Sequence, residues 1–166
     1  MVLDLGELVL DSRELAEAIV WFKKHGYAFG AKKERIGGNC KRVRLEKGNF
    51  LYEDEWCGDF QAPGREIVIH KPTERRVWQM AYWGGMLPEF EDPEFIGETF
   101  AFLKTALAKV SVKRPFRGPE YSEQGEFAYL CEVKGDISNF NGEEKIYHRR
   151  ELVFKQCFGG STAIEE

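Results

Sequence analysis

Two segments of the chain have the apolar spacing of amphipathic helices. In residues 11–25, a stripe of apolar side chains lies between Asp11, a capping residue type, and Gly26, a glycine suited to the end of a helix. In residues 93–109, the start at Asp92 has the residue types that begin helices, and apolar residues follow at helical intervals. We therefore predict one helix near the start of the chain and a second in its middle.

Apolar and polar residues alternate with period two over most of the remaining chain, as in half-buried strands. The alternation starts at about residue 41 and turns at Lys47-Gly48. The strands predicted after this turn are 49–57, 64–70, 75–85, 126–134, 143–149 and 151–158. The first three of these are expected to form an antiparallel meander, because only short turns connect them.

Three glycine-containing pairs are interpreted as turns. Gly135-Asp136 and Asn141-Gly142 are hairpin signals between the later strands. Gly84-Gly85 is expected to end the strand that contains Tyr82 and Trp83, so that the chain turns toward the second helix.

This order of elements predicts an α+β fold, with a single curved antiparallel sheet of about six strands packed with two main helices. A partly closed barrel or a two-layer β arrangement is the alternative, because aromatic residues point to both strand faces. We expect a single domain over 1–166, with an N-terminal strand and helix segment (1–26), a central region (27–160) and a short tail (161–166).

Composition restricts the possible partners of the chain. Its 166 residues suffice for one core, which 13 Phe and 4 Trp fill with large rings. The net charge of -4 argues against a general nucleic-acid binder, which needs a surplus of Lys and Arg. Basic residues concentrate in 32–44 and acidic residues in 89–98, and such runs are usually solvated faces. We expect no direct contact with nucleic acid.

The cysteines argue against metal binding. Cys40, Cys57, Cys131 and Cys157 are far apart, no C-x-x-C pair occurs, and the three histidines are equally scattered. The sequence shows no secretory leader and no apolar run of membrane-spanning length. We predict a cytoplasmic protein with reduced thiols, no cofactor, no metal and no membrane partner.

Candidate chemistry comes from side chains that share strand faces. Aromatic residues of neighbouring strands are predicted to form a wall that is either core or the side of a pocket. Arg117, held between prolines in "PFRGP", suits a clamp on a carboxylate or phosphate, or ties its own loop to an acid. With Glu66 and other acids it is expected to form a polar cluster on the open face of the sheet. The predicted ligand-binding residues are Tyr52, Asp54, Trp78, Tyr82, Arg117, Tyr129 and Glu144.

Several short blocks together resemble a bacterial and archaeal domain of unknown function. The blocks are "GNFLYEDEWCGDF", "RVWQMAYWGGM", "PFRGP", "EFAYLCEVKGDISNFNGEEKIY" and "CFGG", and the resemblance covers about residues 27–160. That family also follows a helix-turn-helix in some regulators of the XRE type. The resemblance implies no established activity. Segment 1–26 stands where those regulators have their helix-turn-helix, so direct DNA reading is not implied.

We predict a non-catalytic ligand-binding or sensory module with an aromatic pocket, whose partner is an unknown small molecule or protein. No catalytic residue is assigned, because no G-x-S-x-G elbow occurs and no Cys lies beside a His. One alternative is an acid/base enzyme that uses Asp54, Glu66 or Glu144. The other is a protein interaction or oligomerisation module, in which the chain forms a homo-oligomer.

Overall fold

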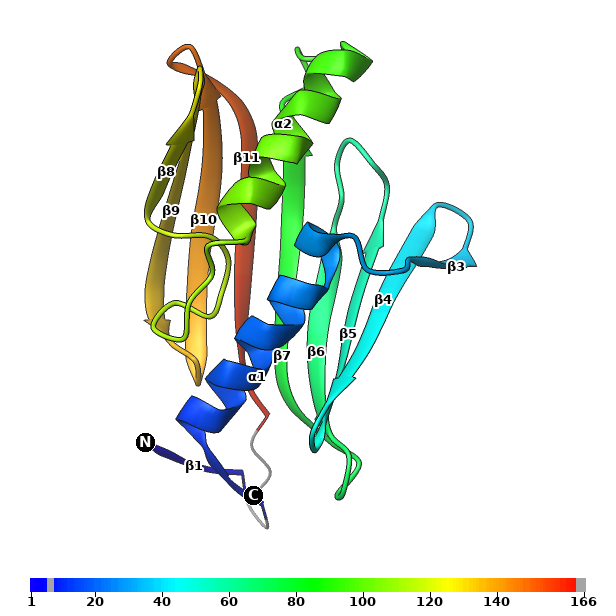
Figure 1. Ribbon diagram of the computed structural model, residues 1–166, viewed down its shortest axis with the longest axis vertical. Coiled ribbons are helices and arrows are strands. Elements are labelled where there is room, and N and C mark those ends of the chain that lie inside the picture. The colour runs from blue at the N-terminus through cyan, green and yellow to red at the C-terminus, as the bar shows by residue number, and fades with distance from the viewer. Residues whose placement is uncertain (6–7, 164–166) are drawn as a thin grey trace.

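A nine-stranded antiparallel sheet makes up most of the protein (Figure 1), whose computed structural model describes residues 1–5 and 8–163. The strand order is β3-β4-β5-β6-β7-β11-β10-β9-β8. The strands are β3 (Glu34–Gly37), β4 (Cys40–Lys47), β5 (Phe50–Cys57), β6 (Gly64–His70), β7 (Arg75–Met86), β8 (Tyr121–Gln124), β9 (Phe127–Asp136), β10 (Asn139–His148) and β11 (Glu151–Thr162). A separate two-stranded sheet pairs β1 (Val2–Asp4) with β2 (Val9–Asp11).

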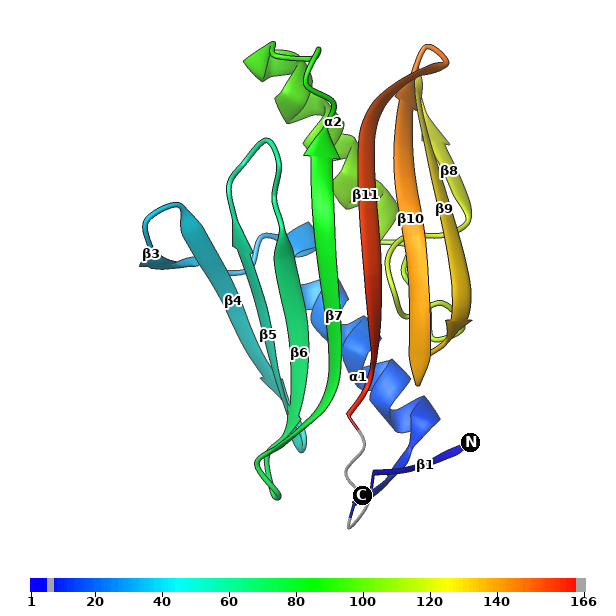
Figure 2. The same ribbon diagram turned by 180° about the vertical axis from the view of Figure 1, so that it is seen from behind.

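Two long helices lie on one face of the large sheet (Figure 1), and Figure 2 shows the opposite face in front of them. Helix α1 (Ser12–His25) begins after Asp11, whose side chain accepts a hydrogen bond from the backbone of Arg13. Helix α2 (Pro93–Leu107) begins after Asp92 in the same way. A short 3-10 helix, η1 (Tyr27–Phe29), follows α1.

The core lies between the sheet and the helices, because alternate strand residues point toward α1 and α2. In β5 the inward side chains are those of Phe50, Tyr52, Asp54 and Trp56, all of which are buried. Helix α1 contributes Leu15, Ile19 and Phe22, none of which is exposed. Two of the inward positions on neighbouring strands are acidic, and this unusual composition defines the site described below.

The predicted α+β fold of about six strands with two main helices is wrong. Strands make up 52% of the described residues and helices 20%, and the large sheet has nine strands. Strands β3 and β8 were not predicted, and segment 1–26, for which one strand was expected, has two short strands, β1 and β2. Edge strands β3 and β8 bury at most one side chain each, so they lack the apolar alternation that reveals a strand. The edge strands β3 and β8 do not pair with each other among the described residues, so the large sheet is open and does not close into a barrel.

All three glycine-containing pairs predicted as turns lie within strands, although Gly135-Asp136 ends β9 directly before the hairpin to β10. Gly84 and Gly85 continue β7 and pair with β11 instead of ending the strand. Their φ angles are 129° and 154°, and a Cβ at Gly84 would lie 2.2 Å from the backbone oxygen of Lys155. Asn141-Gly142 lies inside β10, where a Cβ on Gly142 would meet the ring of Phe158. Gly84, Gly85 and Gly142 allow close approach between neighbouring strands and do not reverse the direction of the chain.

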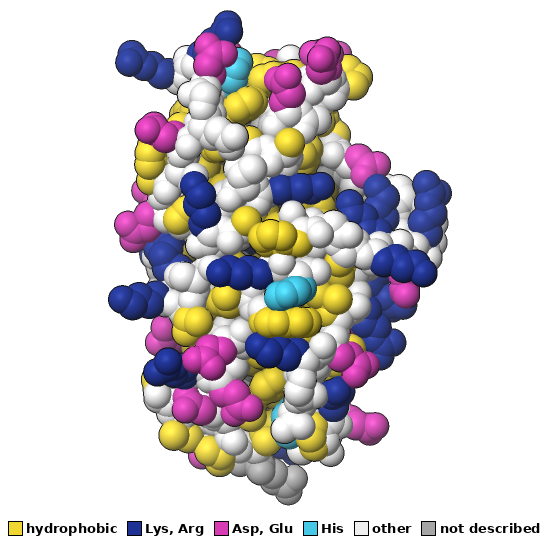
Figure 3. Space-filling model, in the orientation of Figure 1, with side chains coloured by type: hydrophobic (Ala, Val, Ile, Leu, Met, Phe, Trp, Pro, Cys, Tyr) yellow, Lys and Arg dark blue, Asp and Glu magenta, His cyan; other side chains and the backbone are white. Residues whose placement is uncertain are grey.

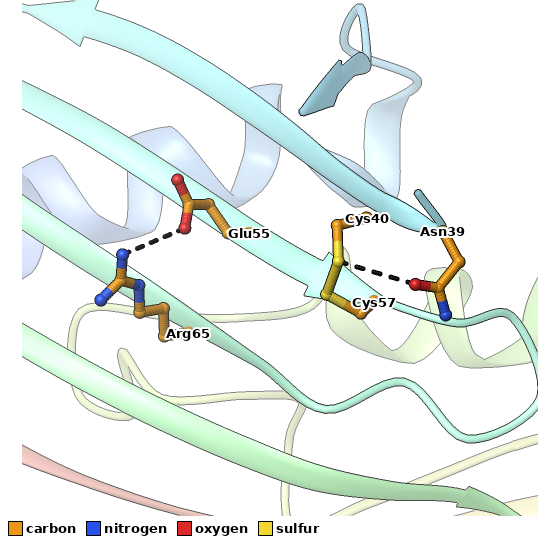
Figure 4. Close-up of a disulfide and its surroundings, with 5 residues drawn as sticks. All are labelled: Asn39, Cys40, Glu55, Cys57 and Arg65. Atoms are coloured by element: carbon orange, nitrogen blue, oxygen red, sulfur yellow. Dashed lines mark hydrogen bonds and ion pairs between the residues drawn. A yellow bond between two sulfur atoms is a disulfide. The ribbon is translucent and has the colours of Figure 1, made fainter. Parts of the chain in front are cut away.

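The expectation of four reduced thiols is wrong, because Cys40 and Cys57 form a disulfide between β4 and β5 (Figure 4). The two residues are directly opposite each other in the antiparallel register. They alternate with the inward residues Lys41 and Trp56, so the disulfide lies on the face of the sheet away from the helices. Cys131 and Cys157 are free.

Strand β11 extends further toward the C-terminus than predicted. Ser161 and Thr162, which were predicted as part of a tail, continue β11, whereas residues 164–166 lie outside the described residues. None of the helices in the described part of the chain is long and apolar enough to cross a membrane.

Candidate functional site

A cavity of about 200 Å³ lies between the inner face of the sheet and the helices. Side chains of α1, η1, α2 and the central strands β5, β6 and β7 line it, together with the loop that carries Arg117. Its outer part is formed by Lys33, Lys41 and Asp59, and its inner part contains Asp54 and Glu66. Lys and Arg side chains also gather over β3 and β4, on the right of the space-filling view (Figure 3).

Two carboxylates meet in the inner part of this cavity. Asp54 on β5 is the direct antiparallel partner of Glu66 on β6, so both side chains point to the same face of the sheet. Asp54 is 6% exposed and Glu66 is 3% exposed. Two like charges at this burial repel each other strongly unless cations or protons compensate them.

A buried lysine compensates Glu66. Lys23, in the last turn of α1, donates hydrogen bonds of 2.5 Å to Glu66 Oε2 and to the backbone oxygen of Phe116. Burial lowers the pKa of Lys23, while the nearby Glu66 opposes this effect. Lys23 therefore links α1, β6 and the loop after α2 through one ammonium group.

A second ion pair lies beside the first. Arg117 donates from Nε and Nη2 to Glu144 Oε1, at 3.0 and 2.7 Å, and its Nη1 lies 3.7 Å from Glu66 Oε1. The other Glu144 oxygen accepts a 2.5 Å hydrogen bond from the hydroxyl of Tyr129, which in turn accepts one from the backbone of Gly118. All the described polar atoms of the Glu144 carboxylate are thus partnered, which holds the Arg117 loop against β10.

Asp54 differs from the other two acids because it has no ion pair among the described residues. Its Oδ1 accepts a 2.6 Å hydrogen bond from the hydroxyl of Tyr82 on β7. Burial and the charge of Glu66 raise the pKa of Asp54 to about 7, although the hydrogen bond from Tyr82 and the nearby charges of Lys23 and Arg117 oppose the rise. Asp54 can therefore gain or lose a proton near neutral pH, and it is the acid that a bound group is free to contact.

Aromatic rings form much of the remaining wall. Tyr52, Trp56 and Tyr82 line the cavity from the sheet, and Tyr27 lines it from η1. Tyr52 also stacks on Phe22 of α1, with ring centroids 5.0 Å apart. These rings give the cavity flat apolar surfaces next to its charged groups, a combination typical of small-molecule sites.

The structure brings four of the seven predicted ligand-binding residues to one cavity, namely Tyr52, Asp54, Tyr82 and Arg117. Trp78, Tyr129 and Glu144 do not line it. Trp78 and Tyr129 are fully buried in the core, and Glu144 supports Arg117 from behind.

One part of the site prediction is wrong in its placement. The polar cluster was expected on the open face of the sheet, but it lies on the face that the helices cover, where its acids are buried. Strand alternation groups residues on one face without saying which face the helices will cover, because that choice depends on tertiary packing.

Some cavity residues were not among the predicted site residues, and Lys23 is the most important of these. It lies in the last turn of α1, where a cation is favoured in any case, so its presence there did not indicate a site. Its position four residues after Ile19 places it on the buried stripe of α1, and this spacing was the available signal. Phe100, Leu103 and Leu107 of α2 likewise line the cavity, although the sequence indicated only that they belong to the apolar stripe of a helix.

The described residues contain no group of three or more His, Cys, Asp or Glu side chains arranged to hold a metal ion. The site is therefore built from ion pairs, one acid without a cation, and aromatic walls. This arrangement can bind an organic molecule through charge and stacking, and it can hold or release a proton at Asp54.

Comparison with protein families gives a match over strands β6 to β11 of the sheet. The model of a family described as a domain of unknown function (DUF5680) matches residues 54–163, which are 110 of the 166 residues. Neither the search of curated proteins nor the search of solved structures found a match. The matched segment starts at Asp54, later than the resemblance over 27–160, and it includes Glu66, Tyr82 and Arg117 but not Lys23.

Proposed function

This chain belongs to the DUF5680 family of domains of unknown function, and we propose that it is a non-catalytic module that binds one small organic molecule in the cavity between sheet and helices. The observation that carries this proposal is a single cavity that joins aromatic walls to a buried acid without a cation of its own. A purely structural core has no need of such an acid, because burying an unpaired carboxyl group is costly.

The size of the cavity limits the ligand. An engineered apolar cavity of about 150 Å³ holds benzene, so a cavity of about 200 Å³ suits one ring with short substituents. A ligand on the order of ten non-hydrogen atoms is thus the size class we propose. The resemblance to domains that follow a helix-turn-helix in XRE-type regulators supports a sensory role for such binding.

The test is a screen of single-ring compounds by ligand-detected NMR on the full chain, repeated on two matched variants. Ala62 lines the cavity, so Ala62→Leu fills part of it. Ala81 alternates with the inward Met80 and Tyr82 on β7, so Ala81→Leu adds the same atoms on the opposite face of the sheet. We expect compounds that bind wild type and Ala81→Leu but not Ala62→Leu. The proposal fails if no compound binds, or if filling the cavity leaves binding unchanged.

Acid/base catalysis is the second candidate function, and the pairing of Asp54 with Glu66 favours it. The two carboxylates face each other across β5 and β6, and burial raises the pKa of Asp54 to about 7, where an acid can both accept and donate a proton. Compounds found in the screen can be incubated with the protein in D₂O and followed by NMR. Loss of a carbon-bound proton or a new product, abolished in Asp54→Asn, would support catalysis, and unchanged compounds after prolonged incubation would exclude it for them.

A further inference from the structure

We propose that the ligand is dipolar, with a positively charged nitrogen that pairs with Asp54 and a negatively charged group that pairs with lysines at the outer part of the cavity. This inference rests on the proposed ligand-binding function and adds to it the chemical class of the ligand. Charge balance, the partners of each ionic group and the spacing along β4 and β5 support it.

The buried ionic groups at the inner part of the cavity, counted together with Glu144 behind Arg117, contain three acids and two cations. Lys23 pairs with Glu66, and Arg117 pairs with Glu144 and lies near Glu66, so two cations compensate two carboxylates. Asp54 is the third carboxyl group, and among the described residues it accepts a hydrogen bond only from a neutral phenol, that of Tyr82. A cationic nitrogen at Asp54 would complete the balance and form a charge-assisted hydrogen bond at a site shielded from water.

The outer part of the cavity has the opposite imbalance. Lys41 pairs with Asp59 at 2.6 Å, and no other acid of the outer part remains for Lys33 among the described lining residues. Within residues 1–5 and 8–163, neither Lys33 nor Lys104 forms an ion pair. Both ammonium groups instead lie over the ring of Tyr27, at 5.2 and 4.9 Å from its centroid. Burial and the charges of the neighbouring lysines lower the pKa of Lys33, so an anion placed there is stabilised by several cations at once.

The spacing along the strands from Asp54 to the position of Lys41 suits one substituted ring. Lys41 is the antiparallel partner of Trp56, and Trp56 is two residues along β5 from Asp54 on the same face. Two residues along a strand correspond to about 7 Å. A benzene ring with an aminomethyl group and a carboxylate in para positions spans about this distance, and Tyr52, Trp56 and Tyr82 offer flat surfaces for the ring.

The test uses four compounds of nearly equal size, which are 4-(aminomethyl)benzoate, 4-methylbenzylammonium, 4-methylbenzoate and 4-methylbenzyl alcohol. Their affinities for the full chain are measured by isothermal titration calorimetry near pH 7.5. We expect the dipolar compound to bind about tenfold more tightly than each of the other three. Only this compound carries both a cation for Asp54 and an anion for the outer lysines.

Variants assign each end of the probe. Asp54→Asn should weaken 4-(aminomethyl)benzoate by about tenfold and leave 4-methylbenzoate unaffected, whereas Lys33→Gln should weaken both carboxylates and leave 4-methylbenzylammonium unaffected. Lys134→Gln, an exposed change on β9 away from the cavity, should alter none of the four affinities. Circular dichroism of each variant shows whether it remains folded.

The outcomes separate this inference from the proposed function. Equal binding of the neutral alcohol and the dipolar compound would overturn the dipolar ligand while supporting an aromatic cavity. Failure of all four compounds, with other single rings still bound in an Ala62-dependent way, would also overturn only the dipolar ligand. If the screen and these four compounds all fail, the proposed function falls together with the inference.

Discussion

The protonation of Asp54 gives the sharpest prediction, which is that Asp54→Asn stabilises the protein increasingly as pH rises. Asn has nearly the same shape, and its side-chain oxygen can still accept the hydrogen bond from Tyr82. The substitution therefore removes the charge at position 54 without opening a cavity. Any pH dependence of the stability difference between the two proteins then belongs to the Asp54 carboxyl group.

The sign and size follow from the pKa of Asp54. Burial raises it from 3.8 to about 7, so the folded state binds this proton more tightly than the unfolded state does. The contribution of Asp54 to the free energy of unfolding is therefore constant below about pH 4, falls between pH 4 and 7, and is constant above. Between pH 5 and pH 8 the contribution of Asp54 to the free energy of unfolding therefore falls by about 3 kcal/mol, which corresponds to about two pKa units.

The assay is urea unfolding of wild type and Asp54→Asn at pH 5 and pH 8, followed by circular dichroism. The stability of Asp54→Asn relative to wild type should be about 3 kcal/mol greater at pH 8 than at pH 5. Comparison of the two differences cancels groups that titrate equally in both proteins. A difference that is the same at both pH values would refute the argument, because Asp54 would then be ionised throughout.

Three further predictions concern stability and use the same unfolding assay. Arg117→Met should cost about 3–5 kcal/mol, because it leaves the buried carboxylate of Glu144 without its cation. Reduction of the Cys40–Cys57 disulfide should cost about 3 kcal/mol, since it releases a loop of 17 residues in the unfolded chain. Gly84→Ala should cost more than about 1 kcal/mol, because alanine disfavours its φ of 129° and its Cβ meets the neighbouring strand.

Each of these predictions has a control and a contradicting outcome. A second change, Glu144→Leu, should recover most of the stability lost in Arg117→Met. If stability is not recovered, the loss does not come from the unpaired charge of Glu144. Cys57→Ser without reductant should match the reduced wild type; full stability in either would show that the disulfide adds nothing. Gly97→Ala, in open space on α2, should be neutral or stabilising, so an equal loss in both glycine variants would contradict the steric argument.

The regular elements could be predicted because their signals are local. The caps at Asp11 and Asp92 set the starts of both helices, and period two identified the long strands. The edge strands were missed because an exposed edge needs few apolar residues, as β3 shows with none buried. Edge strands are defined by their backbone pairing with a neighbour, which the periodicity of the sequence does not reveal. The number of strands and the ratio of sheet to helix therefore could not be predicted.

The candidate site was only partly predictable for a similar reason. Period two grouped Tyr52 and Asp54 on one face of β5, but the burial of that face follows from where α1 and α2 pack. The disulfide had an available signal that was not used. A two-residue turn at Gly48-Asn49 places Cys40 opposite Cys57, so turn geometry and register together indicate the pair.

The pairing of β7 with β11 has a consequence for synthesis of the protein. These strands lie in the middle of the sheet, yet the last of them is made only after residues 87–150 have been added. Until then, the growing chain on the ribosome carries β7 as an unprotected border with free backbone groups, a surface prone to aggregation. Nascent chains that stop before Glu151 should thus depend on chaperones far more than the finished polypeptide does.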